Sequence, residues 1–250
     1  MSKETNGIPE PTPDIIEKVQ SIKERLLKHK DASTMTDNER SEIQADINSL
    51  PLEGKLLLLD SMPGHFTAYR EETYESNAGK IRLWMRGVTQ VPAEIIVNAA
   101  NEDLAEGGGV CGAIFREAGR HELTKACREI GHCDTGNAVI TPAFNLNAKY
   151  IIHAVGPIWQ GGNNKEPQKL YGCYKRSLQL AKEHQCHSIA FPLISSGIFG
   201  YPKDKAWRKA IQACKDFFED NQDYELYVNF AILDDDVFEM GLQTIREVFA

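Results

Sequence analysis

The chain has 250 residues, 42% of them hydrophobic, and a formal net charge of −8 at pH 7. This length allows one sizeable core with a small accessory segment. The acidic balance argues against nucleic-acid binding by bulk attraction, so a bound anion would have to be held by local backbone groups. The polar start, MSKETNGIPEPTPD, lacks the apolar segment of a secretory signal, and no apolar run approaches the length of a membrane span.

Six cysteines are spread through the chain without a Cys-x-x-Cys pair. In a chain of this length with no export signal, a disulfide framework is not expected. Cysteine and histidine do not cluster at the spacing of zinc ligands, so no metal site is predicted. We therefore expect reduced, mostly buried cysteines. We also expect no cofactor, no membrane partner, and a cytoplasmic or nuclear monomer that is not secreted.

The first segments in chain order are a polar tail and a helix. Residues 1–13 are polar and rich in proline, and we expect them to be disordered. The sequence TPD at 12–14 has the order of a helix start, with a cap, a proline and an acid in the first turn. An apolar stripe at helical spacing continues to about Lys30.

A second helix is predicted next. The sequence TDNE at 36–39 has capping-box spacing and opens a helix that reaches about Leu50. Residues 14–75 are therefore interpreted as a helical extension, too short and too polar to form a large core of its own. The main domain is predicted to occupy residues 76–250.

From about residue 80, strand-like segments alternate with helical ones. The predicted strands cover residues 80–85, 94–100, 137–142, 150–155, 188–194 and 226–233. The predicted helices cover residues 111–130, 167–184, 203–219 and 236–249. This alternation predicts an α/β fold with a mixed, mainly parallel sheet that helices cover on both faces. Ligands of such folds bind at the carboxyl ends of the strands.

Two glycine-rich segments follow predicted strands. The first is IIVNAANEDLAEGGGVCGAIF at 95–115, and the second is FPLISSGIFGYP at 191–202. A glycine loop that feeds a helix N-terminus directs backbone N–H groups at one point and favours a phosphate. Neither segment has the P-loop or the GxGxxG pattern. One such loop alone is explained by a tight turn, but two at equivalent strand ends favour a diphosphate.

Three ordered motifs, IIVNAAN…GGGVCGAI…AG, YIIHAVGP and FPLISSGIFGYP, closely resemble those of the macrodomain family, whose members bind ADP-ribose. The resemblance covers about residues 80–250. It is greatest to the branch that removes mono-ADP-ribose from proteins and deacetylates O-acetyl-ADP-ribose. It implies a three-layer α/β/α macrodomain whose partner is ADP-ribose or a mono-ADP-ribosylated protein.

The resemblance also implies roles for single residues. The Asn101 amide would hydrogen-bond the distal ribose, which suits a group that both donates and accepts. The alternative for Asn101 is an Asx residue that caps a turn. Phe199 matches an aromatic that packs on the distal ribose, and its alternative is a core aromatic at a turn. His153 is interpreted as a packed, hydrogen-bonded side chain rather than a catalytic one.

The residues expected to contact the ligand lie in the asparagine turn and the two glycine-rich loops. They are Asn98, Ala99, Ala100, Gly107, Gly108, Gly109, Val110, Ser195, Ser196, Gly197, Ile198 and Phe199. Asn101 and Cys111 are the candidates for catalysis.

Two positions depart from the family pattern. Many hydrolytic relatives have Gly-Asp-Ile-Thr where residues 86–89 are Arg-Gly-Val-Thr, so the acid that binds adenine is replaced by Gly87. Backbone contacts or an acid from another loop would have to take its place. Cys111 stands where many active relatives have an aspartate that orients or activates water. A thiol with a pKa of about 8.5 is mostly protonated at neutral pH and is a poor general base.

Macrodomains of the alphavirus type also have Gly-Val-Cys at this point, and that group includes active hydrolases. In that case the phosphate of the ligand polarises the water. The first hypothesis is therefore a hydrolase of mono-ADP-ribosylated proteins or of O-acetyl-ADP-ribose. The second is a reader that binds ADP-ribose without turnover. A third, a binder of nucleic acid or another nucleotide, is disfavoured by the net charge.

Overall fold

The protein is described from a computed structural model in which contacts divide the chain into two units, Met1–Tyr69 and Arg70–Ala250. The structure describes residues 11–28, 36–51, 54, 57–58, 71–76 and 79–249. Within this part, no helix is long and apolar enough to cross a membrane.

The N-terminal unit contains helices α1 (Pro13–Leu27) and α2 (Asp37–Ser49). The predicted capping box is present, because Glu39 N donates to Thr36 Oγ1 at 3.3 Å and Thr36 N donates to Glu39 Oε2 at 2.9 Å. The buried apolar side chains of this unit are Val19, Ile22, Ile43, Leu50 and Leu58. Residues 1–10 of the predicted disordered tail lie outside the described residues. Helix α1 begins at Pro13, which is inside the range 1–13 predicted for that tail.

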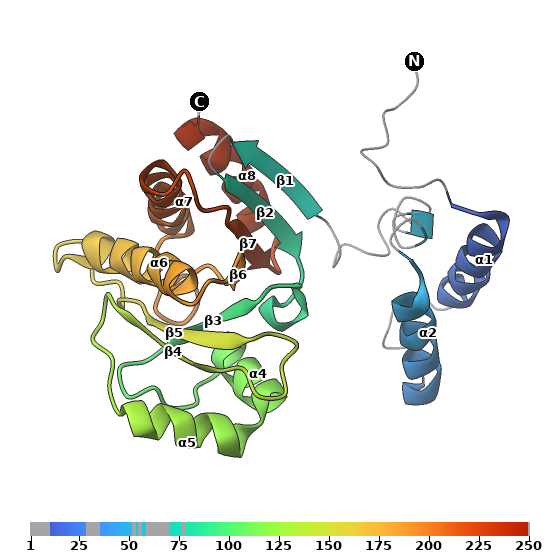
Figure 1. The fold of residues 1–250 in the computed structure, drawn as a ribbon, viewed down its shortest axis with the longest axis horizontal. Helices are drawn as coiled ribbons and strands as arrows, with labels where there is room; N and C mark the ends of the chain where they lie inside the picture. The colour runs from blue at the N-terminus through green and yellow to red at the C-terminus, as the bar shows by residue number, and fades with distance from the viewer. Residues whose placement is uncertain are drawn as a thin grey trace. The chain divides into compact units, whose positions relative to one another are not determined.

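The second unit is built on a seven-stranded sheet in the order β1-β2-β7-β6-β3-β5-β4 (Figure 1). Its strands are β1 (Glu71–Ser76), β2 (Gly79–Met85), β3 (Ile95–Ala100), β4 (Ala138–Pro142), β5 (Tyr150–Val155), β6 (Ser188–Phe191) and β7 (Tyr227–Ile232). The five central strands are parallel, and β1 and β4 run antiparallel at the two edges. The predicted mixed, mainly parallel sheet is confirmed.

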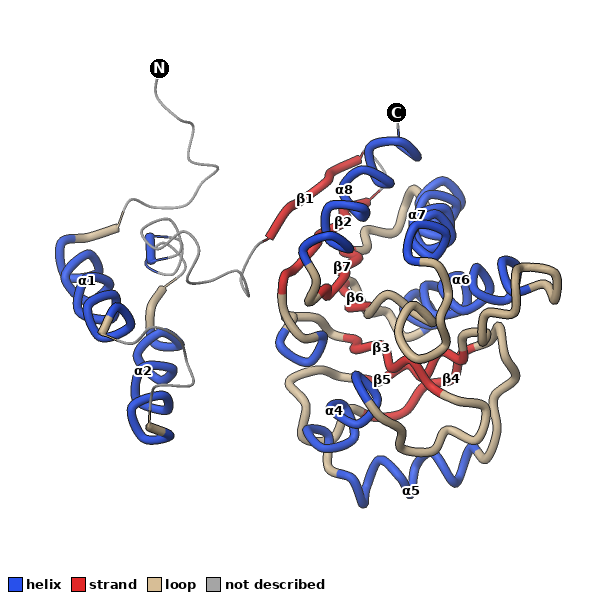
Figure 2. Tube along the Cα trace, turned by 180° about the vertical axis from the view of Figure 1, so that it is seen from behind, coloured by secondary structure: helices blue, strands red, loops and turns tan. Residues whose placement is uncertain are grey.

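Helices cover both faces of this sheet, as the views in Figures 1 and 2 show. They are α4 (Gly109–Ala118), α5 (Arg120–Ile130), α6 (Glu166–Glu183), α7 (Lys203–Asp220) and α8 (Asp235–Phe249). On one face, α6, α7 and α8 bury Tyr174, Trp207 and Phe238 against the sheet. On the other, α4 and α5 bury Phe115 and Leu123. A large apolar side chain buried in this way contributes roughly 2–3 kcal/mol, so both helical layers are firmly attached.

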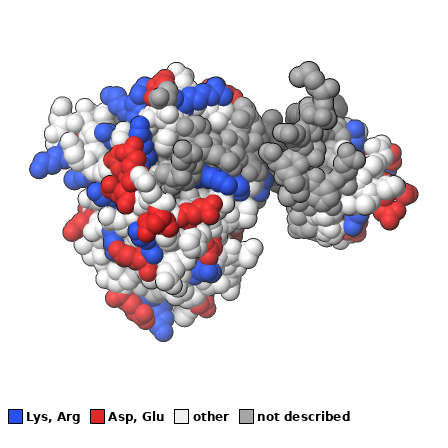
Figure 3. Space-filling view, turned by 45° about the horizontal axis from the view of Figure 1, so that its top comes forward, with Lys and Arg blue, Asp and Glu red and all other residues white. Residues whose placement is uncertain are grey.

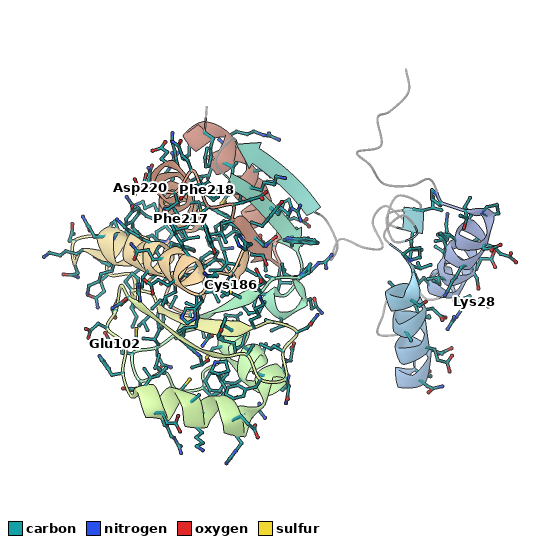
Figure 4. The ribbon with its side chains drawn as sticks, viewed as in Figure 1. Lys28, Glu102, Cys186, Phe217, Phe218 and Asp220 are labelled. Atoms are coloured by element: carbon teal, nitrogen blue, oxygen red, sulfur yellow. The ribbon has the colours of Figure 1, made fainter. Side chains whose placement is uncertain are left out.

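The two helical layers can also be followed in the view with side chains, Figure 4. Phe217, Phe218 and Asp220 lie on α7, on the opposite side of the sheet from α4 and α5 (Figure 4). Acidic and basic side chains are interspersed on the face shown in Figure 3. The three-layer α/β/α arrangement predicted for the main domain is therefore confirmed.

The predicted boundary between extension and main domain is wrong in detail. Residues 71–76, assigned to the helical extension, form the edge strand β1, which pairs with β2 from Glu71↔Trp84 to Ser76↔Gly79. The contact boundary accordingly falls between Tyr69 and Arg70. The physical reason is that a strand pair is held by backbone hydrogen bonds, so a polar sequence such as EETYES can add to an edge without an apolar pattern.

Two further elements differ from the expectation. The single helix predicted over 111–130 is two helices, α4 and α5, separated at Gly119, whose φ of 101° no helix accommodates. The strand predicted over 188–194 ends at Phe191, because Pro192 cannot donate a ladder hydrogen bond. The residues released from that strand become part of the loop that faces the first glycine-rich segment.

Candidate functional site

The candidate site lies at the end of the sheet where the five parallel strands have their carboxyl ends. The loops after β3, β5 and β6 are neighbours there, because β3 lies between the other two strands. The loops after β5 and β6 are in direct contact. A Cβ built on Gly156, after β5, would lie 2.1 Å from Ser195 Oγ, after β6. Trp159 N donates to Phe199 O at 2.9 Å and joins the same two loops.

The first loop begins with a turn that Asn101 closes. Its Oδ1 accepts from Ala105 N at 3.0 Å, and its Nδ2 donates to Ala105 O at 2.9 Å. Leu104 N also donates to Asn101 O at 3.0 Å, and Leu104 takes a φ of 53°. Asn101 therefore has the turn-capping role considered as its alternative. Its amide keeps one N–H and one acceptor lone pair for another partner, so the ribose role stays a prediction.

Three glycines shape the end of this loop. Gly109 has a φ of 59°, a left-handed conformation that glycine adopts without strain, and it is the first residue of α4. A Cβ on Gly112 would lie 2.7 Å from Gly107 O, so the loop can approach the helix only because residue 112 is glycine. The N–H groups of Gly108, Gly109 and Val110 have no hydrogen-bond partner among the described residues. Unpaired N–H groups at a helix N-terminus are the kind of donors that can bind an anion.

The second loop presents a matching set of donors. Gly197, Ile198 and Phe199 have no partner for their N–H groups in the described part of the chain. Ser195 takes a φ of 64°, which is a sparsely populated conformation for serine, and its buried Oγ has no partner among the described residues. The Ser196 hydroxyl is used locally, since it donates to Leu193 O at 2.8 Å.

The two loops face each other across a short distance. A Cβ on Gly108 would lie 3.8 Å from Ile198 Cδ1, and Ile198 is 87% exposed. Phe199 is half-buried in the same loop. The structure thus brings together the predicted loops 107–110 and 195–199, with backbone donors on both sides. We call this arrangement the cradle.

Cys111 lies beneath the cradle and is closed to solvent. Its side chain is 4% exposed, and its Sγ accepts from Gly107 N at 3.3 Å and from Asn98 Nδ2 at 3.6 Å. Burial raises the pKa of this thiol, although the two N–H donors oppose that shift. The thiol is therefore protonated at neutral pH, and its observed role is to accept hydrogen bonds within the loop.

Asn98 also points away from the cradle surface. Alternation along β3 places it on the same face as Ile96 and Ala100, towards α4, and it is 1% exposed. Ala100 is buried in that layer and Ala99 is half-buried. Asn98 was predicted to contact the ligand, but the structure shows it within the protein, where it contacts Cys111 and His153. The strand periodicity in the sequence could have placed it there.

Gly87 stands at the position where the resemblance predicts an acid in many relatives. Gly87 precedes the short 3₁₀ helix η3 (Val88–Gln90), and its N–H donates to Gln90 Oε1 at 3.3 Å. The register pairs Met85 with Ile232, so Leu233 and Asp234 follow the strand next to Gly87. Asp234 caps α8 by accepting from Val237 N at 3.1 Å. Leu233 is 78% exposed, a feature that the sequence analysis did not single out.

Two surface grooves of about 610 Å³ in this unit lie outside the cradle. One lies between α6 and α7 and the other along α5, and neither contains any of the predicted site residues. Among the described residues, no group of three or more His, Cys, Asp or Glu side chains could hold a metal ion. All six cysteines fall in the described part of the chain and are buried and unpaired, as expected.

Fold and site together define an α/β module with backbone N–H groups, unpaired among the described residues, at the carboxyl ends of its parallel strands. Residues 97–210 match the Macro domain family. The chain is 46% identical over 157 residues to a Macro domain-containing protein of Chlorobaculum tepidum, a match that covers 62% of this chain and 91% of that protein. The chain therefore belongs to the Macro domain family, and the predicted resemblance is confirmed.

Two other proteins bear on function. The chain is 46% identical over 144 residues to an O-acetyl-ADP-ribose deacetylase of Cronobacter sakazakii, covering 56% of this chain and 79% of that protein. It also resembles the crystal structure of a Trypanosoma brucei macrodomain in complex with ADP-ribose, with a TM-score of 0.64 and 27% identity. That similarity covers 95% of this chain and 97% of the other.

Proposed function

We propose that the chain binds ADP-ribose in the cradle, with the diphosphate between loops 107–110 and 195–199. The observation that carries this proposal is the opposed pair of loops, each with three consecutive backbone N–H groups that have no partner among the described residues. Six such unpaired backbone donors on two neighbouring loops and the N-terminal end of α4 suit a dianion, even in a chain with a net charge of −8. The similarity to a macrodomain in complex with ADP-ribose supports this ligand.

We further propose that the bound ligand is hydrolysed, as mono-ADP-ribose attached to a protein or as O-acetyl-ADP-ribose. Asn101 orients the distal ribose with the free capacity of its amide. For a mono-ADP-ribosylated protein, a water molecule polarised by the ligand phosphate attacks the anomeric carbon of the distal ribose, the bond from that carbon to the acceptor breaks, and the proton of the water passes to the released acceptor. For O-acetyl-ADP-ribose, the water attacks the acetyl carbonyl carbon, the ester bond to the ribose oxygen breaks, acetate forms, and the ribose oxygen takes up a proton of the water. Cys111 takes no proton in this scheme, because its thiol is buried and protonated. The similarity to an O-acetyl-ADP-ribose deacetylase supports hydrolysis.

A second candidate function is a reader that binds ADP-ribose without turnover. The observation that favours it is the same buried Cys111, since the position offers no carboxylate to accept a proton from water. A reader needs only the cradle. Both functions therefore predict binding, and they differ in the chemical step alone.

The test is to incubate the protein with an auto-mono-ADP-ribosylated substrate and with O-acetyl-ADP-ribose, and to follow product release. Calorimetry with ADP-ribose runs in parallel. Binding with release supports the hydrolase. Binding without release, even at stoichiometric protein, leaves the reader. No binding of ADP-ribose contradicts both.

A further inference from the structure

A row of buried polar side chains crosses the sheet beneath the first loop. Thr141 Oγ1 lies 3.0 Å from His153 Nε2, and His153 Nδ1 lies 3.2 Å from Asn98 Nδ2. Asn98 Nδ2 donates to Cys111 Sγ, which accepts in turn from Gly107 N. We call these five residues the relay. It connects β4, β5, β3 and α4 in that order and ends on the loop that forms one side of the cradle.

The register of the sheet explains why the side chains meet. Asn98 pairs directly with His153 across β3 and β5, and Val139 pairs with His153 across β5 and β4. Thr141 lies two residues beyond Val139 and so faces the same side. The relay therefore occupies the face that α4 and α5 cover, where Phe115 packs edge-on to His153 at a centroid distance of 6.4 Å.

The polar side chains of the relay are buried, and each makes at least one contact within it; Asn98 Oδ1 alone among their side-chain oxygens and nitrogens is buried without a partner among the described residues. Thr141, His153 and Asn98 are 3%, 0% and 1% exposed. Burying a polar group without a partner costs about 1–3 kcal/mol, so these contacts must be maintained together. Burial lowers the pKa of His153 to about 4, which keeps the ring neutral. In the tautomer whose Nδ1 accepts from Asn98 Nδ2, the ring proton is on Nε2, which lies 3.0 Å from Thr141 Oγ1 and 3.7 Å from Cys127 Sγ.

The position of the relay distinguishes it from ordinary core packing. An apolar side chain at 153 would fill the space, but it would leave the Asn98 amide without its nitrogen partner. The amide would then be free to rotate away from Cys111 Sγ. The sulfur that accepts from Gly107 N would then be held less firmly, and the loop would lose its link to β3 through Asn98. Its contacts through Glu102 and Glu106 remain.

We propose that His153 is a positioning residue for the ADP-ribose cradle, acting through Asn98 and Cys111 on the Gly107 loop. The inference rests on the proposed function for its ligand. The geometry of the relay and the loop is observed independently of that function. His153 touches no ligand in this scheme and moves no proton.

The first test removes one hydroxyl with little change of shape. Thr141→Val is compared with Thr244→Val, whose residue is 6% exposed on α8 and donates only to Met240 O at 2.8 Å. Loss of one hydrogen bond corresponds to about five-fold in an equilibrium. We expect Thr141→Val to weaken ADP-ribose binding by roughly three- to ten-fold, and Thr244→Val to leave it unchanged. Equal effects of the two variants would overturn the proposal.

A second measurement does not depend on the ligand. In the protein without ligand, the NMR amide resonance of Gly107 should shift and exchange faster with solvent in Thr141→Val than in Thr244→Val. If the wild type fails to bind ADP-ribose, the proposed function fails, while this measurement still decides the relay. An unchanged Gly107 amide in Thr141→Val would overturn it.

A rescue experiment separates positioning from folding. His153→Asn places an amide near the position of Nδ1, whereas His153→Leu offers an apolar side chain. We expect the asparagine variant to retain most of the ADP-ribose affinity and the leucine variant to lose at least ten-fold, a loss equivalent to about 1.4 kcal/mol. Circular dichroism confirms that both are folded. Equal affinity in the two variants would overturn the proposal, and an unfolded leucine variant leaves the decision with Thr141→Val.

Discussion

Replacing Cys111 with alanine removes the sulfur that accepts from Gly107 N at 3.3 Å and from Asn98 Nδ2 at 3.6 Å. Each is a neutral hydrogen bond to a weak acceptor, and such a bond contributes about 1 kcal/mol at most. The loop then shifts slightly and the cradle is less well ordered. We expect the kcat/KM of Cys111→Ala to fall by roughly five- to thirty-fold, which corresponds to about 1–2 kcal/mol.

A catalytic thiol would give a different magnitude. Loss of a general base lowers the rate by roughly 100- to 10,000-fold. Because burial raises the pKa of Cys111 above the ordinary value of a thiol, a thiolate mechanism would also make the rate rise with alkaline pH. The variant would lose that rise. The positional role predicts a small loss in rate and a pH profile of unchanged shape.

The assay is steady-state release of ADP-ribose from a mono-ADP-ribosylated protein, measured from neutral to mildly alkaline pH. Cys214→Ala is the matched control, because Cys214 is fully buried on α7 in the other helical layer. Cys111→Asp supplies a stronger acceptor to the same two donors and should keep or raise turnover. A loss of more than about 100-fold in Cys111→Ala, with normal folding, would refute the reasoning.

Three further predictions follow from single contacts. Asn101→Ala should lower turnover by about 100-fold or more while ADP-ribose binding weakens only several-fold; equal losses in calorimetry and release contradict a role in orientation. Gly112→Ala places a Cβ 2.7 Å from Gly107 O and should weaken binding roughly ten-fold, whereas Gly241→Ala, which crowds the core, should lower only the melting temperature. Burial lowers the pKa of His153 from 6.5 to about 4. The free energy of unfolding of the wild type should therefore fall by about 3 kcal/mol as the pH is lowered from 6.5 to about 4. Urea unfolding of His153→Asn should not show that fall.

The sign of the last effect follows from proton binding. His153 stays neutral in the folded protein and becomes protonated in the unfolded chain below pH 6.5. The unfolded chain therefore binds more protons between pH 6.5 and about 4, and stability falls as the pH is lowered through this window. A wild type whose stability does not change in this window, relative to the variant, would contradict the buried neutral ring.

The α/β fold could be predicted because its central strands are short apolar runs and its helices have an apolar stripe. The strand β1 could not, because EETYES has no apolar periodicity and its hydrogen bonds are those of the backbone. Gly119 ends α4 by a φ of 101°, but a glycine within a helical pattern is tolerated often enough that the sequence alone does not show the break.

The loops of the site were predictable from glycine content and strand position. Strand alternation also indicates that Asn98 faces inward, but the contacts that it makes there were not predictable. Asn98 belongs to the Asn-Ala-Ala-Asn motif and was therefore expected at the ligand. Its strand register directs it instead to His153, and the contact with Cys111 depends on a loop that folds back onto α4. Such a contact joins three elements, so no local pattern in the sequence reports it.

This arrangement accounts for a cysteine at a position where many relatives have an aspartate. An aspartate there would meet the same donors, Gly107 N and Asn98 Nδ2, so both side chains can accept from them, the carboxylate more strongly than the sulfur. They are not equivalent as bases, because a carboxylate is ionised at neutral pH and the buried thiol is not. The loop geometry, and hence binding, can therefore persist with cysteine. Hydrolysis can persist only if the ligand supplies the missing base, and the ratio of turnover between Cys111→Asp and wild type measures how well it does so.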